Sequence, residues 1–187
     1  MAHTQDQLDV VDILTVDHQE VLDLLQEIKF ATGDQQRRDL ADLVISELVR
    51  HSVAEEMYVY PAMRKHLPDG DAAVKHDVEE HKELEATMKE LEGVPAGDPR
   101  FRVLLDQLEE ILRDHVHDEE DEQFPLLRRT IERSELVEIG EKVRLAKQVA
   151  PTRPHPSAPN NELFHKLVGP GVGLVDRLRD RLTDRPS

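Results

Sequence analysis

Cysteine and tryptophan are absent from this chain of 187 residues, and aromatic side chains are scarce, with 2 Tyr and 4 Phe. Without cysteine, disulfides, thiolate catalysis, iron–sulfur clusters and thiolate zinc sites are excluded, and cysteine usage indicates no cellular compartment. The apolar residues are mostly Leu, Val, Ile and Ala, set among many Glu, Lys and Arg. This composition favours helices.

Long apolar runs are also missing, and none approaches the length that spans a membrane. The N-terminal residues lack the basic and apolar regions of a signal peptide. We therefore expect a cytoplasmic protein that does not associate with membranes.

The formal net charge is −16, and the charge is unevenly distributed along the chain. Residues 151–187 carry 6 Lys and Arg against 4 Asp and Glu, so the remainder carries 18 against 36. The acidic residues 1–150 would repel the phosphate backbone of a nucleic acid, which argues against a nucleic-acid partner. A solvated helix surface accounts for most of the carboxylates, whereas carboxylates held inside the fold would suit a cation.

Helical periodicity recurs in four long segments. We predict these helices over about residues 4–31, from after 34 to 66, 72–91 and 100–124, with a shorter helix at about 134–149. Pro61 and Pro125 are expected to kink or end the second and fourth helices, and Asp98 is expected to cap the fourth. Strand signals are absent and the loops are short, which favours antiparallel neighbours. The predicted fold class is all-α, an up-down-up-down antiparallel four-helix bundle with extra C-terminal helices.

Composition changes after residue 150. Residues 151–160, PTRPHPSAPN, are predicted to form a proline-rich linker. Residues 161–187 form a tail that contains the amphipathic stretch VGLVDRLRDRL. Residues 1–150 would then hold the bundle and its short following helix. The tail is a candidate for docking on the bundle, for self-association or for contact with an electron donor.

An internal repeat is the strongest signal in the chain. His51 is followed by Glu at four and five residues and by Pro at ten, and the same pattern follows His115. A His that comes directly after an acidic residue precedes each pattern: His18 stands 33 residues before His51, and His81 stands 34 residues before His115. The chain therefore consists of two similar helical hairpins, each with one His followed by one His-x-x-x-Glu.

Residues four apart lie on one helix face, so each His-x-x-x-Glu points an imidazole and a carboxylate the same way. Two antiparallel hairpins related by a pseudo-twofold axis would bring four His and two Glu together inside the bundle. Imidazole and carboxylate suit iron, manganese and zinc, and a Glu can bridge two ions. The repeat thus predicts a metal site, with a metal-free structural bundle as the alternative. A ferritin-like site needs paired Glu-x-x-His motifs, and only Glu162 and His165 have that spacing.

Through these motifs, residues 8–135 resemble the hemerythrin-like family, also called the HHE cation-binding domain. The dipeptides Tyr60-Pro61 and Phe124-Pro125 match the aromatic–proline element of that family. The resemblance implies two iron ions joined by an oxo or hydroxo bridge. It also implies four terminal His ligands and two bridging Glu ligands, which are His18, His51, His81, His115, Glu55 and Glu119.

Six neighbouring residues are second-tier candidates, as ligands or as partners of ligands: Glu120, Asp77, Glu80, His76, Tyr58 and Tyr60. His76 is expected at the surface, and both tyrosines are expected in the core. Oxygen-carrying members of the family have a His four residues before His81, where this chain has Asp77, and an Asp where it has Glu120. These two departures argue against reversible oxygen carriage.

The resemblance implies a non-haem di-iron protein that reacts with hydrogen peroxide, nitric oxide or oxygen. A catalase-like or nitric-oxide-consuming activity is compatible with such a centre. The alternative is an oxygen or iron sensor without turnover, in which the bundle couples occupancy of the site to the tail or a partner.

Overall fold

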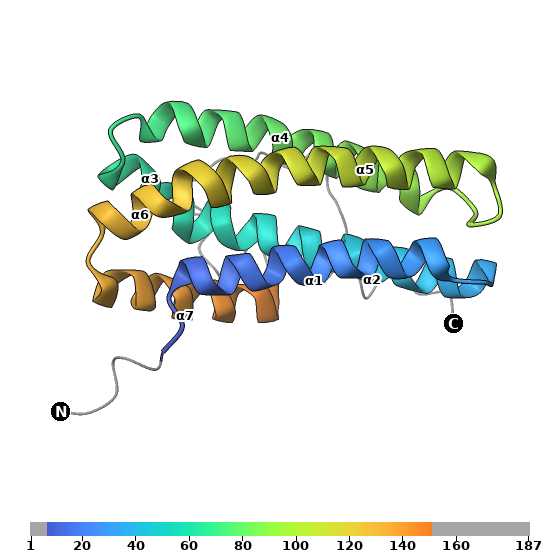
Figure 1. Ribbon diagram of the computed structural model, residues 1–187, viewed down its shortest axis with the longest axis horizontal. Coiled ribbons are helices and arrows are strands. Elements are labelled where there is room, and N and C mark those ends of the chain that lie inside the picture. Colours follow the sequence, from blue (N-terminus) through green and yellow to red (C-terminus); the bar gives the residue numbers. More distant parts are fainter. Residues whose placement is uncertain (1–6, 151–187) are drawn as a thin grey trace.

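The computed structural model describes residues 7–150, and these residues form helices and turns but no strand. Helices α1 (Val10–Phe30) and α2 (Asp34–Ala54) form one hairpin, and α4 (Gly70–Glu92) and α5 (Pro99–Asp118) form a second that packs beside it (Figure 1). The chain runs up, down, up and down through these helices, so the predicted all-α bundle is confirmed. The predicted linker and tail, residues 151–187, lie outside the described residues.

Two of the bundle helices continue through a π-helical turn and a proline. Helix α2 passes through η1 (Glu55–Val59) into α3 (Tyr60–His66), and α5 passes through η2 (Glu119–Gln123) into α6 (Phe124–Thr130). In an α-helix the ring of a proline clashes with the carbonyl four residues earlier, and the wider turn, with a bond from residue i to residue i−5, accommodates it. The expected interruption at Pro125 takes the form of this π-helical turn, after which the chain continues as α6 to Thr130.

The helix ends follow their capping residues. Helix α1 begins at Val10 and not near residue 4, because Asp9 forms a capping box with Asp12. Asp98 caps α5 as predicted, since its carboxylate accepts a hydrogen bond from the backbone N–H of Arg100 at 2.8 Å. The shorter helix is α7 (Arg133–Val149), which lies along α1 and α2 (Figure 1).

Two apolar clusters form the core, one toward each end of the bundle. The first joins the start of α1 to α3, α6 and α7 and includes Leu14, Met63 and Leu127. The second fills the other end and includes Val21 and Leu108. His18 stands on α1 between Leu14 and Val21, and it belongs to a layer of buried polar side chains between the clusters. No helix within residues 7–150 combines the length and the apolar character needed to cross a bilayer.

Candidate metal centre

The four repeated histidines meet in the buried layer between the two apolar clusters. Each comes from a different bundle helix, and each is at most 3% exposed. The ring centroids of His18 and His51, in one hairpin, are 4.8 Å apart, and those of His81 and His115, in the other, are 5.0 Å apart. His115 lies farther from the first pair, at 6.2 and 6.5 Å. The imidazoles therefore form two pairs, one in each hairpin.

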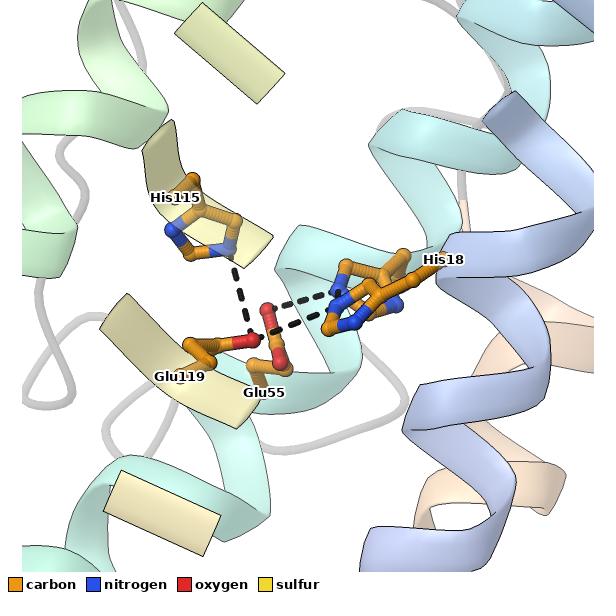
Figure 2. A group of neighbouring side chains, drawn as sticks. His18, Glu55, His115 and Glu119 are labelled. Atoms are coloured by element: carbon orange, nitrogen blue, oxygen red, sulfur yellow. Dashed lines mark hydrogen bonds and ion pairs between the residues drawn. The ribbon is translucent and has the colours of Figure 1, made fainter. Parts of the chain in front are cut away.

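Glu55 and Glu119 lie between these pairs, and both are fully buried. The Oε2 atom of Glu55 is 3.1 Å from Nε2 of His51 and 3.4 Å from Nε2 of His81. The Oε2 atom of Glu119 is 3.2 Å from Nε2 of His18 and 3.6 Å from Nε2 of His115, and Figure 2 shows it between these two imidazoles. Each carboxylate thus lies between a His of one hairpin and a His of the other.

A second carboxylate lies beside the Nδ1 atom of every imidazole. The four pairs are His18 with Glu120 at 2.7 Å, His51 with Asp17 at 3.4 Å, His81 with Glu56 at 3.3 Å and His115 with Glu80 at 2.9 Å. In a neutral imidazole whose Nδ1–H donates to a carboxylate, the lone pair is on Nε2, here on the side of Glu55 and Glu119. This arrangement is typical of histidines that bind metals.

The repeat explains where these carboxylates come from. The second Glu of each His-x-x-x-Glu-Glu reaches the single His of the other hairpin, while the acidic residue before each single His holds the other His of its own hairpin. Sequence reasoning singled out Glu80 and Glu120 but missed Asp17 and Glu56. Both occupy the repeat positions that match Glu80 and Glu120, so a comparison of the two copies could have found them.

The oxygen atoms of the central carboxylates lack hydrogen-bond donors, so they are available to a cation. Neither oxygen of Glu55 or of Glu119 has a hydrogen-bond partner beyond its ion-pair contacts with the imidazoles, and Nε2 of His115 is also unpaired. Buried polar atoms without partners are costly in free energy. One atom from each of five side chains lies within 4.8 Å of the others, those of His18, His51, Glu55, His115 and Glu119. This donor set fits a metal ion.

The electrostatics of the cluster also favour positive charge. Burial by itself lowers the pKa of His51, but Glu55 and Asp17 raise it to about 10. At His81, burial likewise lowers the pKa, but Glu55 and Glu56 raise it to about 10. The pKa of Glu55 falls well below its usual range beside these imidazoles, although burial raises it. Protons on imidazole thus balance the carboxylates, and a bound metal cation would replace them.

The aromatic residues of the two repeats differ beside the site. Tyr60 is buried, its ring stacks on His81, and its hydroxyl is 3.2 Å from Nε2 of that residue. Phe124 takes the matching place in the other repeat and stacks on His18. A hydroxyl is therefore present at one His pair only. Tyr58 is half-buried against the first apolar cluster, and no hydrogen bond within residues 7–150 joins it to the histidines.

Two second-tier candidates on α4, Asp77 and His76, are adjacent in sequence but differ in burial. Asp77 is fully buried, and one of its oxygens accepts a hydrogen bond from the side-chain amide of Gln123 at 2.8 Å. Burial raises the pKa of Asp77 to about 7. His76 is exposed, and its Nε2 lies 3.0 Å from a carboxylate oxygen of Asp118. Asp77 thus faces the interior beside the second His pair, and His76 faces solvent.

The family described as the Hemerythrin HHE cation binding domain matches residues 9–127. This chain belongs to the hemerythrin HHE cation-binding family. An uncharacterized hemerythrin-like protein of Schizosaccharomyces pombe is 30% identical over 178 residues, which cover 95% of this chain and 88% of that protein. A protein of Nostoc named DNA nickase is 24% identical over 140 residues, which cover 75% of this chain and 39% of that protein.

A solved structure shows the same fold. The crystal structure of a hemerythrin HHE cation binding domain-containing protein from Mycobacterium kansasii matches with a TM-score of 0.66 at 20% identity, over 91% of this chain and 99% of that one. This hemerythrin-like chain thus has the helical bundle of the family and a His/Glu cluster that could bind metal. Helix α7 lies beyond the residues that the family description matches.

Proposed function

We propose that this hemerythrin-like protein holds two non-haem iron ions and uses them to convert hydrogen peroxide, nitric oxide or oxygen. The observation that supports the proposal most is the position of Glu55 and Glu119 between two His pairs. One pair would hold each ion, and the two Glu side chains would bridge the ions. Bound iron would supply electrons and open coordination positions for the small molecule.

The protein around the ions would orient their ligands and exclude water. The carboxylates at Nδ1 fix the tautomer and the ring orientation of each His. The two apolar clusters close the layer from both ends. Burial, Glu55 and Glu119 raise the pKa of Tyr60. Its hydroxyl therefore stays protonated, and it can donate a hydrogen bond to a small molecule beside His81.

The ligand set supports turnover more than reversible carriage. Two His for each ion and two shared Glu would leave coordination positions open at both ions, and Asp77 stands where the oxygen carriers have an additional His. For peroxide, two molecules would yield two water molecules and one oxygen molecule, and no further reductant is required. We infer no nucleic-acid partner, because the net charge of −16 repels phosphate.

A sensor is the second candidate function, and a contact of α7 favours it. Lys147 of α7 bonds to Asp17, whose other oxygen lies beside His51. Residues 151–187 follow α7 directly in the chain. Metal or ligand binding at His51 would therefore alter the contact between Asp17 and Lys147, and through α7 it would affect the residues that follow the bundle. Turnover of peroxide separates this candidate from the leading one, because a sensor binds its ligand without sustained conversion.

The test begins with the iron content of protein expressed with added iron, which we expect to be about two atoms per chain. The loaded protein is then mixed with peroxide while an electrode records oxygen, and the reduced protein is mixed with nitric oxide and with oxygen in the absence of air. The H51A variant should bind no iron and release no oxygen from peroxide, whereas the H117A variant should do both. One iron atom per chain or none would refute the dinuclear centre, and loaded protein that reacts with none of the three molecules would refute the conversion.

A further inference from the structure

A second group of side chains with metal-binding chemistry lies at the surface, near the buried cluster. His76 and Glu80 come from α4, and Asp118 is the last residue of α5. Nε2 of His76 is 3.0 Å from Oδ2 of Asp118 and 3.4 Å from Oε1 of Glu80. One atom from each of the three lies within 4.8 Å of the others. One imidazole and two carboxylates suit ferrous iron, manganese and zinc.

Glu80 connects this surface group to the interior. Its Oε1 faces His76, and its Oε2 is 2.9 Å from Nδ1 of His115. Asp77, Glu80 and His115 form a third group whose atoms lie within 4.8 Å of one another. Asp77 is 0% exposed, and its Oδ2 atom has no hydrogen-bond partner. A buried carboxylate oxygen without a donor is costly, and a cation beside it would remove that cost.

The three groups overlap and lead inward. The surface group shares Glu80 with the middle group, and the middle group shares His115 with the buried cluster. The exposed fraction of the side chains falls from 58% at His76 to 14% at Glu80 and 1% at His115. A hydrated ion could exchange its water molecules for carboxylate oxygens in steps along this series, without crossing an apolar barrier.

The first hairpin has no such series. By the alignment of the two repeats, His76 corresponds to Ile13, Asp77 to Leu14 and Asp118 to Ala54. All three are apolar and belong to, or pack against, the first apolar cluster. Helix α7 packs on α1 and α2 and covers these positions, so among the described residues the polar series occurs in the second hairpin only.

We propose that His76, Glu80 and Asp118 form a surface docking site for a divalent metal ion, which then passes Asp77 and Glu80 to load the buried cluster. This inference rests on the proposed dinuclear centre. The surface group would increase the rate at which metal reaches the buried cluster. It would not change how tightly the buried cluster binds metal at equilibrium.

The test compares metal loading in two double variants of the full chain. H76A/D118N removes the surface group and leaves Glu80 in place. H117A/D121N removes a similar pair on the same helical rod, whose atoms are 2.8 Å apart and whose side chains are 68% and 67% exposed. Chains freed of metal by a chelator, with helix content matched by circular dichroism, are mixed with Co²⁺ in the absence of air, and the visible absorption of the bound ion is followed in time.

We expect H76A/D118N to load about tenfold more slowly or worse at low Co²⁺ concentration, whereas H117A/D121N loads as fast as the unmodified protein. Final Co²⁺ content and spectrum should agree in all three. Equal loading rates would overturn the inference, and so would a lower final content in H76A/D118N, because the group would then belong to the equilibrium site. A failure of the proposed centre itself is distinguishable, since the unmodified chain would then bind fewer than about two ions.

A second measurement detects the docked ion directly. Iron-loaded protein is titrated with Mn²⁺, and free Mn²⁺ is measured by electron paramagnetic resonance. The unmodified protein and H117A/D121N should each bind one additional, weakly held ion that H76A/D118N does not bind. Absence of that ion from the unmodified protein would overturn the docking site.

Discussion

Lys147 donates a hydrogen bond to Asp17 across 2.5 Å, although the two residues are 130 positions apart in the chain. Both side chains are largely buried, and the other carboxylate oxygen of Asp17 faces Nδ1 of His51. The pKa of Asp17 is lowered by His51 and Lys147, although burial raises it. Helix α7 therefore fixes the charge and the position of a carboxylate that holds one of the four central imidazoles.

The first prediction concerns this contact. Asp17→Asn should weaken iron binding by roughly 10–100-fold, because carboxylates that hold metal-bound histidines contribute that much to affinity. Lys147→Met should weaken it in the same direction and to a smaller extent. Lys142→Met, at an exposed position of α7, serves as the control. Competition with a coloured chelator measures the affinities, and equal values for K147M and K142M would show that α7 does not support the site.

Loss of a central imidazole should cost both iron and stability. We expect His51→Ala and His115→Ala to lose iron, because each removes a donor from a buried set of few ligands. The free energy of unfolding should then fall by about 3–4 kcal/mol where free iron exceeds its Kd by about 100–1,000-fold. His117→Ala, whose side chain is 68% exposed, should change neither quantity. Iron analysis and urea unfolding provide the measurements, and similar losses in all three variants would contradict the assignment.

Removal of residues 151–187 should leave a folded bundle that still loads iron. The six central residues, and the carboxylates beside the histidines, all lie between Asp17 and Glu120. Helix α7 ends at Val149 and is retained in such a variant. Circular dichroism and iron analysis of a chain that ends at Ala150 test this. A truncated chain without iron would mean that the removed residues cover or complete the site.

The helices and the central residues could be predicted because they depend on local spacing. His51 and Glu55 lie four apart, and the second copy of the motif made a chance match improbable. The carboxylates at Nδ1 could not be assigned in the same way, because Glu56 reaches His81 across 25 positions and Glu120 reaches His18 across 102. Such pairs depend on the register of the packed hairpins, which no local pattern encodes.

The π-helical turns show a second limit of local reasoning. A proline inside a helical pattern usually indicates a kink or an end, but Pro61 and Pro125 each follow a π-helical turn, after which the chain continues as a helix. The wider turn keeps the rod continuous, and Glu55 and Glu56 are both buried although they are adjacent. An α-helix turns 100° between neighbours, so its spacing rule gave one inward Glu for each copy. It left Glu120 as a second-tier candidate and missed Glu56.

A pH-dependent contribution to stability is expected from an ion pair outside the candidate metal centre. Glu109 of α5 contacts Lys29 of α1 and Arg113, and these cations lower the pKa of Glu109 although burial raises it. Its folded pKa is thus below its unfolded value of about 4.3. The stabilisation is therefore complete above about pH 4.3 and is lost as the pH falls through the folded pKa.

Glu109→Gln should accordingly destabilise the protein by about 1–3 kcal/mol at neutral pH, and the difference should shrink in acid. Glu110→Gln, at the exposed neighbouring position, is the control. Urea unfolding at a series of pH values measures both. A cost at Glu109 that is the same at pH 7 and in acid would mean that packing, and not charge, stabilises this contact.

The last prediction concerns the difference between the two halves of the centre. The four His and two Glu occupy matching positions of the two repeats, but the hydroxyl of Tyr60 lies 3.2 Å from Nε2 of His81, and Phe124 offers no such group at His18. Asp77 adds a further difference on the same side, because its counterpart in the first hairpin is Leu14. Two bound irons should therefore have unequal surroundings, and Mössbauer spectra of the loaded protein should resolve two components of equal area.

Tyr60→Phe copies the first hairpin onto the second and should bring these two components closer together. Some separation should remain because Asp77 is unchanged. Iron content should be preserved, since all four His and both Glu are retained. Tyr58→Phe removes the hydroxyl of a half-buried tyrosine that packs against the first apolar cluster, and it should leave the spectrum unchanged. If Tyr60→Phe also leaves it unchanged, the hydroxyl has no influence on the iron nearest His81, and it cannot assist a small molecule that binds there.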